Sequence, residues 1–464
     1  MSKILFENSN IEFIDGDRGK NYPKQEDFSD KGHCIFLSAK NVTSCGFNFD
    51  NKVFISLEKD NQLKAGKLKR NDIVITTRGT IGNIAIYDDK IPYNDVRINS
   101  GMLILRADSN KLDTKFLYYY LSSKEFKEQV NSLISGSAVP QLPIRDIKKL
   151  TLPNITKKQQ EKIANIISSF EDRIELNTQI NQTLEQIAQA LFKSWFVDFD
   201  PVRAKVQALS DGLSLEQAEL VAMQAISGKT PEELTALSQT QPDRYAELAE
   251  TAKAFPCEMV EVSNSMYIPK GWKIKYFNEI IDTYIDNRGK TPPIEKQGIP
   301  LLEVKHLPKN SVFPDLNTIK YISNDTYENW LRNKPEALDI MLSTVGTVGR
   351  VNLVPINNKI AIAQNILGFR FNQKKATQIY MFYLMKSEKF IFDMEARVVE
   401  TVQKSIKRKD LEKIPLLIPT LELQNLFSKF VIPFVIKQNN SENTNLEKIR
   451  NDLLPKLLSG EIQL

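Results

Sequence analysis

Two loops of the sequence carry an arginine and a lysine on either side of a glycine. They are DRGK at residues 17–20 and NRGK at residues 287–290. A guanidinium is a planar fork of donors that suits guanine or a phosphate, and an ammonium adds a point charge. The alternative is that each segment is a solvated loop that binds no ligand. This alternative is less convincing when the same pattern occurs twice than when it occurs once. We therefore predict DNA contacts from Arg18, Lys20, Arg288 and Lys290.

A second repeated segment is TTRGTIGN at residues 76–83, which is answered by STVGTVGR at residues 343–350. Backbone N–H groups in such a segment can cradle a phosphate. The alternative is a tight β-hairpin in which the glycines supply positive φ angles, and the two interpretations are compatible. The residue equivalent to Arg78 in the second segment is Val345, and the residue equivalent to Asn83 is Arg350. Such differences are expected if the two segments recognise different DNA sequences. The candidates for DNA contact here are Arg78, Thr80, Asn83, Thr347 and Arg350.

Further donors recur at matching places in the two halves of the chain. Some follow strand-like runs, IFLSA in one half and PLLEV in the other, and the rest precede the long helices. Together they predict a basic, polar rim on each half. The residues are Lys40, Asn41, Lys305 and His306 after the strands, and Ser137, Gln141, Arg145, Gln403, Lys404, Lys407 and Arg408 before the helices.

Catalytic motifs are missing from the sequence. It contains no G-x-x-x-x-G-K-[ST] loop, no G-x-G-x-x-G after a strand, no H-E-x-x-H, no G-x-S-x-G and no Asn/Asp-Pro-Pro-aromatic tetrapeptide. His33 next to Cys34 offers two metal ligands, which do not make a site, and the three cysteines show no paired spacing. We therefore predict a non-catalytic reader without a metal.

The whole chain reads as a tandem duplication. DIVITTRGTIGNIAI (72–86) matches DIMLSTVGTVGRVNL (339–353), and FLYYYLSSKEF (116–126) matches YMFYLMKSEKF (380–390). Each copy has a β-rich stretch, a short helix and a long helix. We predict five segments: recognition domain 1 at 1–155, a central helix at 156–199, an acidic helical insert at 200–262, recognition domain 2 at 263–420 and a C-terminal helix at 421–464.

The long helices carry apolar residues at alternating steps of three and four, which is the spacing of a coiled-coil seam. Both stripes have asparagines in the middle, and the obvious partner of each stripe is the other. The alternative is the core face of an ordinary surface helix. We expect a kink or an early end at Pro433 and Pro455. The predicted pairing residues are Ile163, Ile167, Phe170, Ile174, Leu184, Leu191, Phe427, Val431, Phe434, Leu446, Ile449 and Leu453.

The bulk composition is that of a globular protein, with 41% hydrophobic and 26% charged residues and a net charge of +5. A chain of 464 residues has room for two or three domains. The sequence has neither an 18-residue apolar run nor a leader, so we expect a cytoplasmic protein. The acidic insert is expected to avoid DNA and to form small helices, one of them capped by Thr230 before Pro231.

Several segments together resemble the DNA specificity subunit of type I restriction-modification systems. They are SAVPQLPIRDIKKLTLPNITKKQQEKIANII, LEQIAQALFKSWFVDFDPVRAK and the C-terminal LLPKLLSGEIQL, in tandem order. The resemblance implies an α+β fold in which two tandem β-rich target-recognition domains each read half of a bipartite, asymmetric DNA site. It further implies that the long helices pair as an antiparallel coiled coil with pseudo-twofold symmetry and set the gap between the half-sites.

The same resemblance implies that the chain works with partner subunits and that these subunits bind all the cofactors. Two modification subunits would bind S-adenosylmethionine and methylate adenine, while restriction subunits would use ATP and Mg to cleave unmodified DNA. The chain itself would bind no cofactor and would act on double-stranded DNA only by recognising it. Recognition domain 1 lacks the IPKGWKI lead-in found at residues 268–274. The alternatives are a specificity chain of a type II-like restriction and methylation complex, or a stand-alone DNA-binding scaffold.

Overall fold

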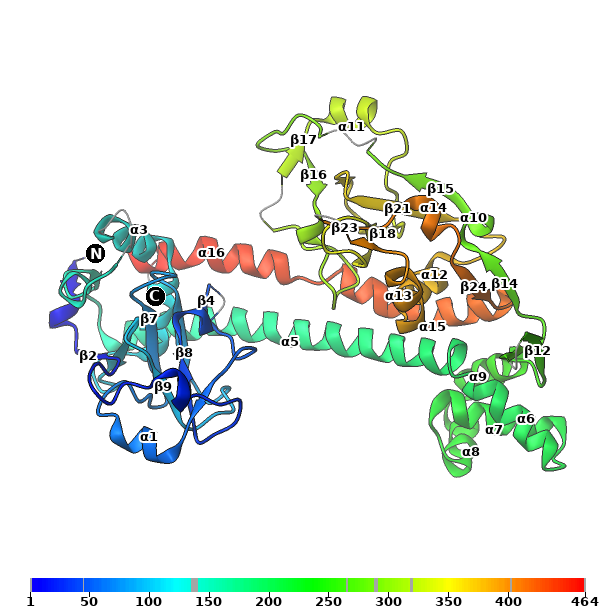
Figure 1. Cartoon of the computed structure of the whole chain (residues 1–464), viewed down its shortest axis with the longest axis horizontal. Helices are drawn as coiled ribbons and strands as arrows, with labels where there is room; N and C mark the ends of the chain where they lie inside the picture. Colours follow the sequence, from blue (N-terminus) through cyan, green and yellow to red (C-terminus); the bar gives the residue numbers. More distant parts are fainter. Residues whose placement is uncertain are drawn as a thin grey trace. The chain divides into compact units, whose positions relative to one another are not determined.

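The computed structural model describes residues 2–44, 46–134, 141–263, 266–287, 291–317, 320–400 and 403–462. The chain forms two compact units (Figure 1). Unit 1 is Met1–Leu176 with Glu442–Leu464, and unit 2 is Asn177–Ser441. Both limits fall in the long helical segments, so each unit combines one β-rich domain with parts of those helices. The fold is α+β, as the sequence predicts.

Unit 1 is built on a four-stranded antiparallel sheet in the order β2-β10-β7-β8. The central strand β7 is buried at all five positions because the sheet is covered on both faces. Ile73 and Ile75 pack with the helix that follows the sheet, while Val74 packs with a second, three-stranded sheet on the other face. The strands are β2 (Ile11–Asp15), β10 (Met102–Ala107), β7 (Asp72–Thr76) and β8 (Ile84–Tyr87), and the second sheet holds β6 (Phe54–Ile55), β3 (Cys34–Leu37) and β9 (Val96–Ile98).

Unit 2 repeats this topology strand for strand. Its four-stranded sheet has the order β15-β21-β18-β19, and its three-stranded sheet has the order β17-β16-β20. In each small sheet one strand pair is parallel, β3 with β9 and β16 with β20. The strands are β15 (Ile281–Ile285), β21 (Ile366–Phe371), β18 (Ile340–Ser343), β19 (Val351–Leu353), β17 (Lys320–Ile322), β16 (Ile299–Leu302) and β20 (Ala361–Ile362).

Short elements complete the two units. Each β-rich domain is closed by a two-stranded antiparallel pair that joins its first and last strands, β1 with β11 and β14 with β24. These four are β1 (Lys3–Leu5), β11 (Thr151–Pro153), β14 (Lys273–Tyr276) and β24 (Pro415–Ile418). The other strands are β4 (Val42–Thr43), β5 (Gly46–Phe47), β12 (Met259–Ser263), β13 (Met266–Pro269), β22 (Val399–Glu400) and β23 (Lys404–Ser405). The short helices are α1 (Leu57–Gln62), α2 (Thr114–Ser122), α3 (Lys124–Leu133), α4 (Ile144–Ile147), α10 (Phe277–Ile280), α11 (Asn324–Trp330), α12 (Gln378–Lys386), α13 (Glu388–Glu395) and α14 (Arg408–Leu411).

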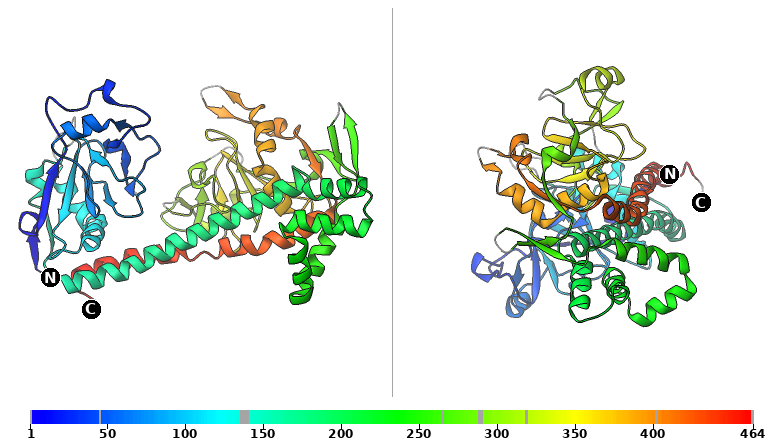
Figure 2. Two further views of the ribbon diagram at one scale, coloured as in Figure 1. Left: turned by 90° about the horizontal axis from the view of Figure 1, so that it is seen from below. Right: turned by 90° about the vertical axis from the view of Figure 1, so that its right-hand side faces the viewer.

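The central helix α5 is continuous over 40 residues, Lys157–Phe196 (Figure 2). In unit 1 its first half packs on α16 (Asn443–Ser459), and Ile163 and Ile167 share a core with Leu457 and Leu458. One turn further on, Glu171 pairs with Arg450 at 3.4 Å, and the Ile174 carbonyl then accepts a hydrogen bond from Asn443 at 3.3 Å. The order of these contacts makes the two helices of unit 1 antiparallel.

In unit 2 the second half of α5 packs on α15 (Leu421–Asn439). The rings of Phe192, Trp195 and Phe196 lie 5.7, 5.8 and 5.2 Å from the ring of Phe427. Val431 is buried in the same core, with Leu191 and Phe434 packed against it. Both halves of α5 are therefore paired, each inside its own unit.

Two expectations for the C-terminal helix are wrong: the early end at Pro433 and Pro455, and the pairing role of Ile449. Pro433 and Pro455 lie inside α15 and α16, and the helix is interrupted at residues 440–442 instead. Both prolines are exposed, so the carbonyls that lose their hydrogen bonds can bind water. Ile449 is 49% exposed and lies outside the packed stripe, while the next residue, Arg450, pairs with Glu171 of α5.

The insert of unit 2 is a group of four helices. Thr230 caps the third of these helices as predicted, because its hydroxyl accepts from the Glu233 N–H while the Glu233 carboxylate accepts from the Thr230 N–H. The helices are α6 (Asp200–Ser210), α7 (Leu215–Ser227), α8 (Pro231–Thr240) and α9 (Pro242–Ala254). None of the helices in the described ranges has the length and apolarity that a membrane span requires.

Candidate nucleic-acid interface

A repeated set of buried polar contacts holds the sheets and helices of both units in place. Arg106 donates to both oxygens of Asp72 at 2.8 Å, and Arg370 donates to both oxygens of Asp339 at 3.0 and 2.7 Å. Both carboxylates are buried, with 1% and 2% of their surface exposed. Paired charges of this kind tolerate burial because each satisfies the other. The sequence analysis did not single out these residues, although the alignment of the two copies contains both aspartates.

A glutamine fixes each β-rich domain to the helix that follows it. Gln160 accepts a hydrogen bond from the Asp113 N–H and donates to the Ile155 carbonyl, at 2.9 and 3.0 Å. In unit 2, Gln424 makes the same two contacts with the Thr377 N–H and the Pro419 carbonyl, at 2.8 and 2.9 Å. We call the Arg–Asp pairs and these glutamines the repeated frame.

Unit 1 has a hollow of about 370 Å³ at one end of its large sheet. We call it hollow 1. Four predicted DNA-contact residues line it: Arg18, Arg78, Gln141 and Arg145. Backbone bonds hold its wall, since Leu142 N–H donates to the Thr77 carbonyl at 3.0 Å. The structure thus brings together residues that lie up to 127 positions apart (145 − 18 = 127).

The arginines of hollow 1 differ in whether an acidic side chain pairs with them. Arg18 pairs with Asp15 at 3.0 Å, and Arg145 lies 3.7 Å from Asp146. Arg78 is exposed, and no ion-pair partner for its guanidinium lies among the described residues of unit 1. Arg78 is therefore the cation of hollow 1 that is most available to a ligand.

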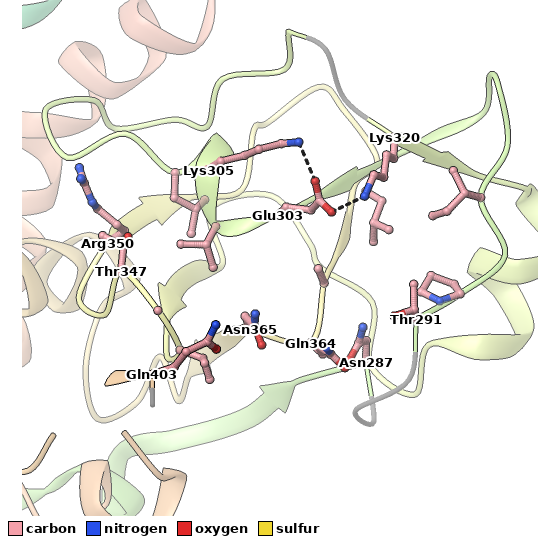
Figure 3. A pocket seen from close by; sticks show the side chains of 18 of the residues that line it. Asn287, Thr291, Glu303, Lys305, Lys320, Thr347, Arg350, Gln364, Asn365 and Gln403 are labelled. Carbon is pink, nitrogen blue, oxygen red and sulfur yellow. Dashed lines mark hydrogen bonds and ion pairs between the residues drawn. The ribbon is translucent and has the colours of Figure 1, made fainter. Parts of the chain in front are cut away.

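Unit 2 has a larger hollow of about 680 Å³ (Figure 3), and its lining includes Val345, the counterpart of Arg78 in hollow 1. We call it hollow 2. Its lining includes the predicted residues Lys305, Thr347, Arg350 and Gln403. The sequence analysis missed other polar lining residues, which Figure 3 shows along two facing sides: Asn287, Glu303, Lys320, Gln364 and Asn365. A comparison of the two copies position by position would have marked Gln364 and Asn365, because Ser100 and Gly101 occupy their places in unit 1.

Glu303 neutralises much of the positive charge of hollow 2. It pairs with Lys320 at 2.7 Å and with Lys305 at 2.9 Å. The hydrogen bond from Lys320, followed by that from Lys305, holds the pKa of the Glu303 carboxyl below its usual value. The carboxylate therefore stays ionised near neutral pH, and the two lysines are held by one partner.

The glycine-rich segments are the turns of the β7–β8 and β18–β19 hairpins, and the phosphate nest stays a prediction. Gly79, Gly82, Gly346 and Gly349 have φ angles of 75°, 83°, 79° and 91°, which glycine adopts most readily. Some of the N–H groups in these turns already have partners in the protein. Gly82 donates to the Thr76 carbonyl, Gly349 to the Ser343 carbonyl and Gly346 to the Lys404 carbonyl, at 3.0, 3.0 and 2.8 Å.

Two predicted DNA contacts, Asn41 and His306, are wrong because both side chains are buried, with 6% and 3% exposed. Each folds back onto the short turn that follows a strand. The Asn41 side-chain oxygen accepts from the Ser38 N–H, and His306 Nδ1 accepts from the Glu303 N–H, both at 2.9 Å. Burial is the main reason that the pKa of His306 is lowered, so the ring is neutral and cannot serve as a surface cation.

Three more predicted contacts are engaged inside the protein. Asn83 donates to the Val42 carbonyl at 2.9 Å, and the Thr80 hydroxyl donates to the Ala39 carbonyl at 3.2 Å. Arg408 donates to Glu412 at 2.9 Å and stacks on Tyr284, 3.4 Å from the ring centroid. These side chains shape the domains. Lys20, Lys40, Lys404 and Lys407 are exposed, while Ser137, Arg288 and Lys290 lie outside the described residues.

One cluster has the composition of a metal site. His33, Asp60 and Asp95 place their ligand atoms within 4.8 Å of one another, a grouping that the sequence analysis did not include. The Lys67 ammonium lies between the two carboxylates, 2.7 Å from Asp60 and 2.8 Å from Asp95, and Arg97 also donates to Asp60. The cations of the protein thus occupy the place that a metal would take.

The sequence also matches known proteins. Residues 10–186 and 269–451 match the model of the type I restriction modification DNA specificity domain. The chain belongs to this family. Each matched region contains one of the two hollows, so both hollows lie in specificity domains.

Relatives in this family span the chain almost completely. The HindI type I restriction enzyme specificity subunit of Haemophilus influenzae is 37% identical over 470 residues, covering 97% of this chain and 99% of that one. The MjaIX specificity subunit of Methanocaldococcus jannaschii is 24% identical and covers 85% and 78%. A crystal structure of the type I restriction-modification S subunit of M. genitalium shares the fold, with a TM-score of 0.51 and 17% identity over 98% of this chain and 96% of that chain.

Proposed function

We infer that the chain is the DNA-recognition subunit of a type I restriction-modification system and that it is not itself an enzyme. Its relatives in the specificity-domain family support this inference. We further propose that hollow 1 and hollow 2 each read one half of a bipartite, asymmetric DNA site. One observation carries this proposal: each specificity domain has a polar hollow beside the equivalent glycine-rich turn, at Arg78 in unit 1 and at Val345 in unit 2, and the linings of the two hollows differ.

The exposed cations around each hollow have a separate task in this proposal. Arg18 and Lys20 in unit 1, and Lys305 and Lys404 in unit 2, would contact phosphates and so fix the register of each domain on the duplex. Side chains inside the hollows would contact base edges, which carry the sequence information. Phosphate contacts strengthen binding to every sequence, whereas base contacts strengthen binding to one.

The paired helices would set the distance between the half-sites. The 40-residue helix α5 is about 60 Å long. Two domains that read the same face of B-DNA must stand about 34–36 Å apart, or a multiple of this, and a helix of this length is long enough to span one such interval. We propose that the surfaces of the helices also bind two methyltransferase subunits, and that restriction subunits join the same complex. S-adenosylmethionine, ATP and Mg would be bound by those partners in the cytoplasm.

The test is a domain exchange inside the complete complex. The chain is produced with its methyltransferase subunits, and methylated adenines are mapped across the host genome. Replacing residues 1–155 with the equivalent segment of a relative should change one half-site and leave the other half-site and the spacing intact. A change in both half-sites, or in neither, would overturn the proposal.

A further inference from the structure

Three equivalent positions beside the glycine-rich turns carry different side chains in the two units, and of these Arg78 lines hollow 1 while Val345, Gln364 and Asn365 line hollow 2. The Gly101 carbonyl accepts from the Thr77 N–H at 2.8 Å, and the Asn365 carbonyl accepts from the Thr344 N–H at 2.9 Å. The backbone of Arg78 forms an isolated antiparallel β-bridge with that of Gln141, and the backbone of Val345 forms the equivalent bridge with that of Ser405. Unit 1 therefore has Arg78, Ser100 and Gly101 where unit 2 has Val345, Gln364 and Asn365.

Gly101 has no side chain, so the space beside Arg78 is open in unit 1. A Cβ added at Gly101 would lie 3.2 Å from the Asn99 side-chain oxygen and 3.8 Å from the Arg78 Cβ. An asparagine there would meet the Asn99 side chain closely and would lie beside Arg78 at an ordinary contact distance. In unit 2 the short Val345 occupies the place of the arginine, and Asn365 occupies the neighbouring place.

Hollow 2 presents amides where hollow 1 presents a guanidinium. Figure 3 places Gln364 and Asn365 on the side of the hollow that faces Glu303 and its two lysines. Their side-chain amides have no hydrogen-bond partner within the described part of the chain. The Asn365 carbonyl accepts from both the Thr344 N–H and the Thr344 hydroxyl, at 2.9 and 3.2 Å, which fixes the backbone that carries the amide.

The two groups match different bases. In the major groove guanine offers two neighbouring acceptors, N7 and O6, which suit the donor fork of arginine. Adenine offers one acceptor, N7, and one donor, the N6 amino group, which suit the oxygen and nitrogen of an amide. Resting on the function proposed above, we propose that Arg78 reads a guanine in the half-site of unit 1, whereas Gln364 and Asn365 read an adenine in the half-site of unit 2.

The test exchanges residues between equivalent positions, using the complete chain with its methyltransferase subunits. Arg78→Val should make the complex accept any base at one position that is a guanine in the wild-type site. The double variant Gln364→Ser/Asn365→Gly should do the same at an adenine in the other half-site. Discrimination at the affected position, measured by methylation rates on duplexes that differ at that base pair, should fall about 10- to 100-fold.

Control variants change similar side chains outside the hollows. Arg332→Val and Asn358→Gly alter exposed residues that do not line hollow 2 and should leave both half-sites unchanged. Each test variant must still require its unaltered half-site, which shows that the complex is folded and assembled.

Three outcomes would overturn the inference. The first is relaxation at a base other than guanine for Arg78→Val, or other than adenine for the amide variant. The second is no relaxation at all. The third is uniform weakening on all sequences with a shallower salt dependence, which marks a phosphate contact. If the exchange of residues 1–155 still moves one half-site, these outcomes contradict only the assignment of bases, and the proposed function stands.

Discussion

The two units share their buried polar contacts and differ at the rims of their hollows. The Arg106–Asp72 pair and Gln160 of unit 1 recur as Arg370–Asp339 and Gln424 in unit 2, with nearly the same distances. A buried polar group must keep its partner or lose free energy, so both copies have kept these contacts. Side chains at an exposed rim have no such constraint, and they can diverge to suit different ligands.

The junction between sheet and helix shows a second difference, this time inside the core. In unit 2 the buried Glu185 of α5 accepts from Lys386 at 2.5 Å and from the Tyr383 hydroxyl at 3.0 Å. In unit 1 the matching Tyr119 hydroxyl donates to Ser168 at 3.3 Å and also interacts with the Glu171 carboxylate, which pairs with Arg450 at 3.4 Å. The Glu185–Lys386 pair is almost fully buried, whereas the side chains of Glu171 and Arg450 are 36% and 28% exposed, so the charged junction is buried in one unit and partly exposed in the other.

Breaking the charged junction should have the largest effect. Lys386→Ala leaves the buried Glu185 carboxylate without its cation, which should cost about 3–5 kcal/mol of the unfolding free energy of unit 2. Only 8% of the Lys386 side chain and 5% of the Glu185 side chain are exposed, so water cannot replace the lost partner. Urea unfolding followed by tryptophan fluorescence measures this directly, because Trp195, Trp272 and Trp330 all belong to unit 2.

A surface lysine three residues further on is the matched control. The Lys389 side chain is 70% exposed and lies 3.6 Å from Asp393, so Lys389→Ala should change stability by less than about 0.5 kcal/mol. The double variant Lys386→Ser/Glu185→Gln, which makes the junction neutral, should recover part of the loss. Equal effects of Lys386→Ala and Lys389→Ala would show that the buried charge pair is not what distinguishes the units.

Removing the shared glutamines should have a smaller and equal effect on the two units. Gln160→Ala leaves the Asp113 N–H and the Ile155 carbonyl without partners, and Gln424→Ala does the same to the Thr377 N–H and the Pro419 carbonyl. Each change should cost about 1–3 kcal/mol. Circular dichroism reports both losses, whereas tryptophan fluorescence should follow Gln424→Ala more closely.

The exposed Gln182 on α5 provides the control for these variants, and Gln182→Ala should leave both transitions in place. A loss in only one unit would mean that the two glutamines do not have equivalent roles, despite their matching contacts.

Patterns that depend on neighbours in sequence were predictable. The three-four spacing identified the paired stripe of α5, and the Thr-Pro-Glu-Glu segment identified the cap at Thr230. The glycines of the repeated turns were assigned positive φ because no other residue adopts it easily. Ile449 was misplaced because Ile449 and Arg450 both lie about one helical turn before Leu453, and the apolar residue was chosen although Arg450 is the one that contacts α5.

Side-chain direction in loops was not predictable from residue type. Asn41 and His306 look like loop-tip donors in the sequence, yet both turn inward to cap a three-residue turn. Arg18, Gln141 and Arg145 were identified because basic and polar residues recur in both copies, and Arg78 because it lies in the repeated glycine-rich turn. Gln364 and Asn365 were missed because they carry no charge and follow a buried strand, so only the comparison of equivalent positions reveals them.

The smallest effect concerns the turn capped by Asn41 in one unit and by His306 in the other. Burial lowers the pKa of His306 below its usual 6.5, so on acidification the unfolded chain binds a proton before the folded chain does. The unfolding free energy of unit 2 should therefore be complete above pH 6.5 and fall as the pH drops below it. The variant His306→Asn gives this turn of unit 2 the same capping residue as unit 1. It should remove the dependence of the unfolding free energy on pH between 7.5 and 5.5, where few carboxylates titrate.

Urea midpoints from tryptophan fluorescence at the two pH values measure this dependence. The reverse variant Asn41→His should introduce such a dependence in unit 1, which circular dichroism can follow. If His306→Asn keeps the slope of the wild type, another group causes it, and the two caps are equivalent in practice.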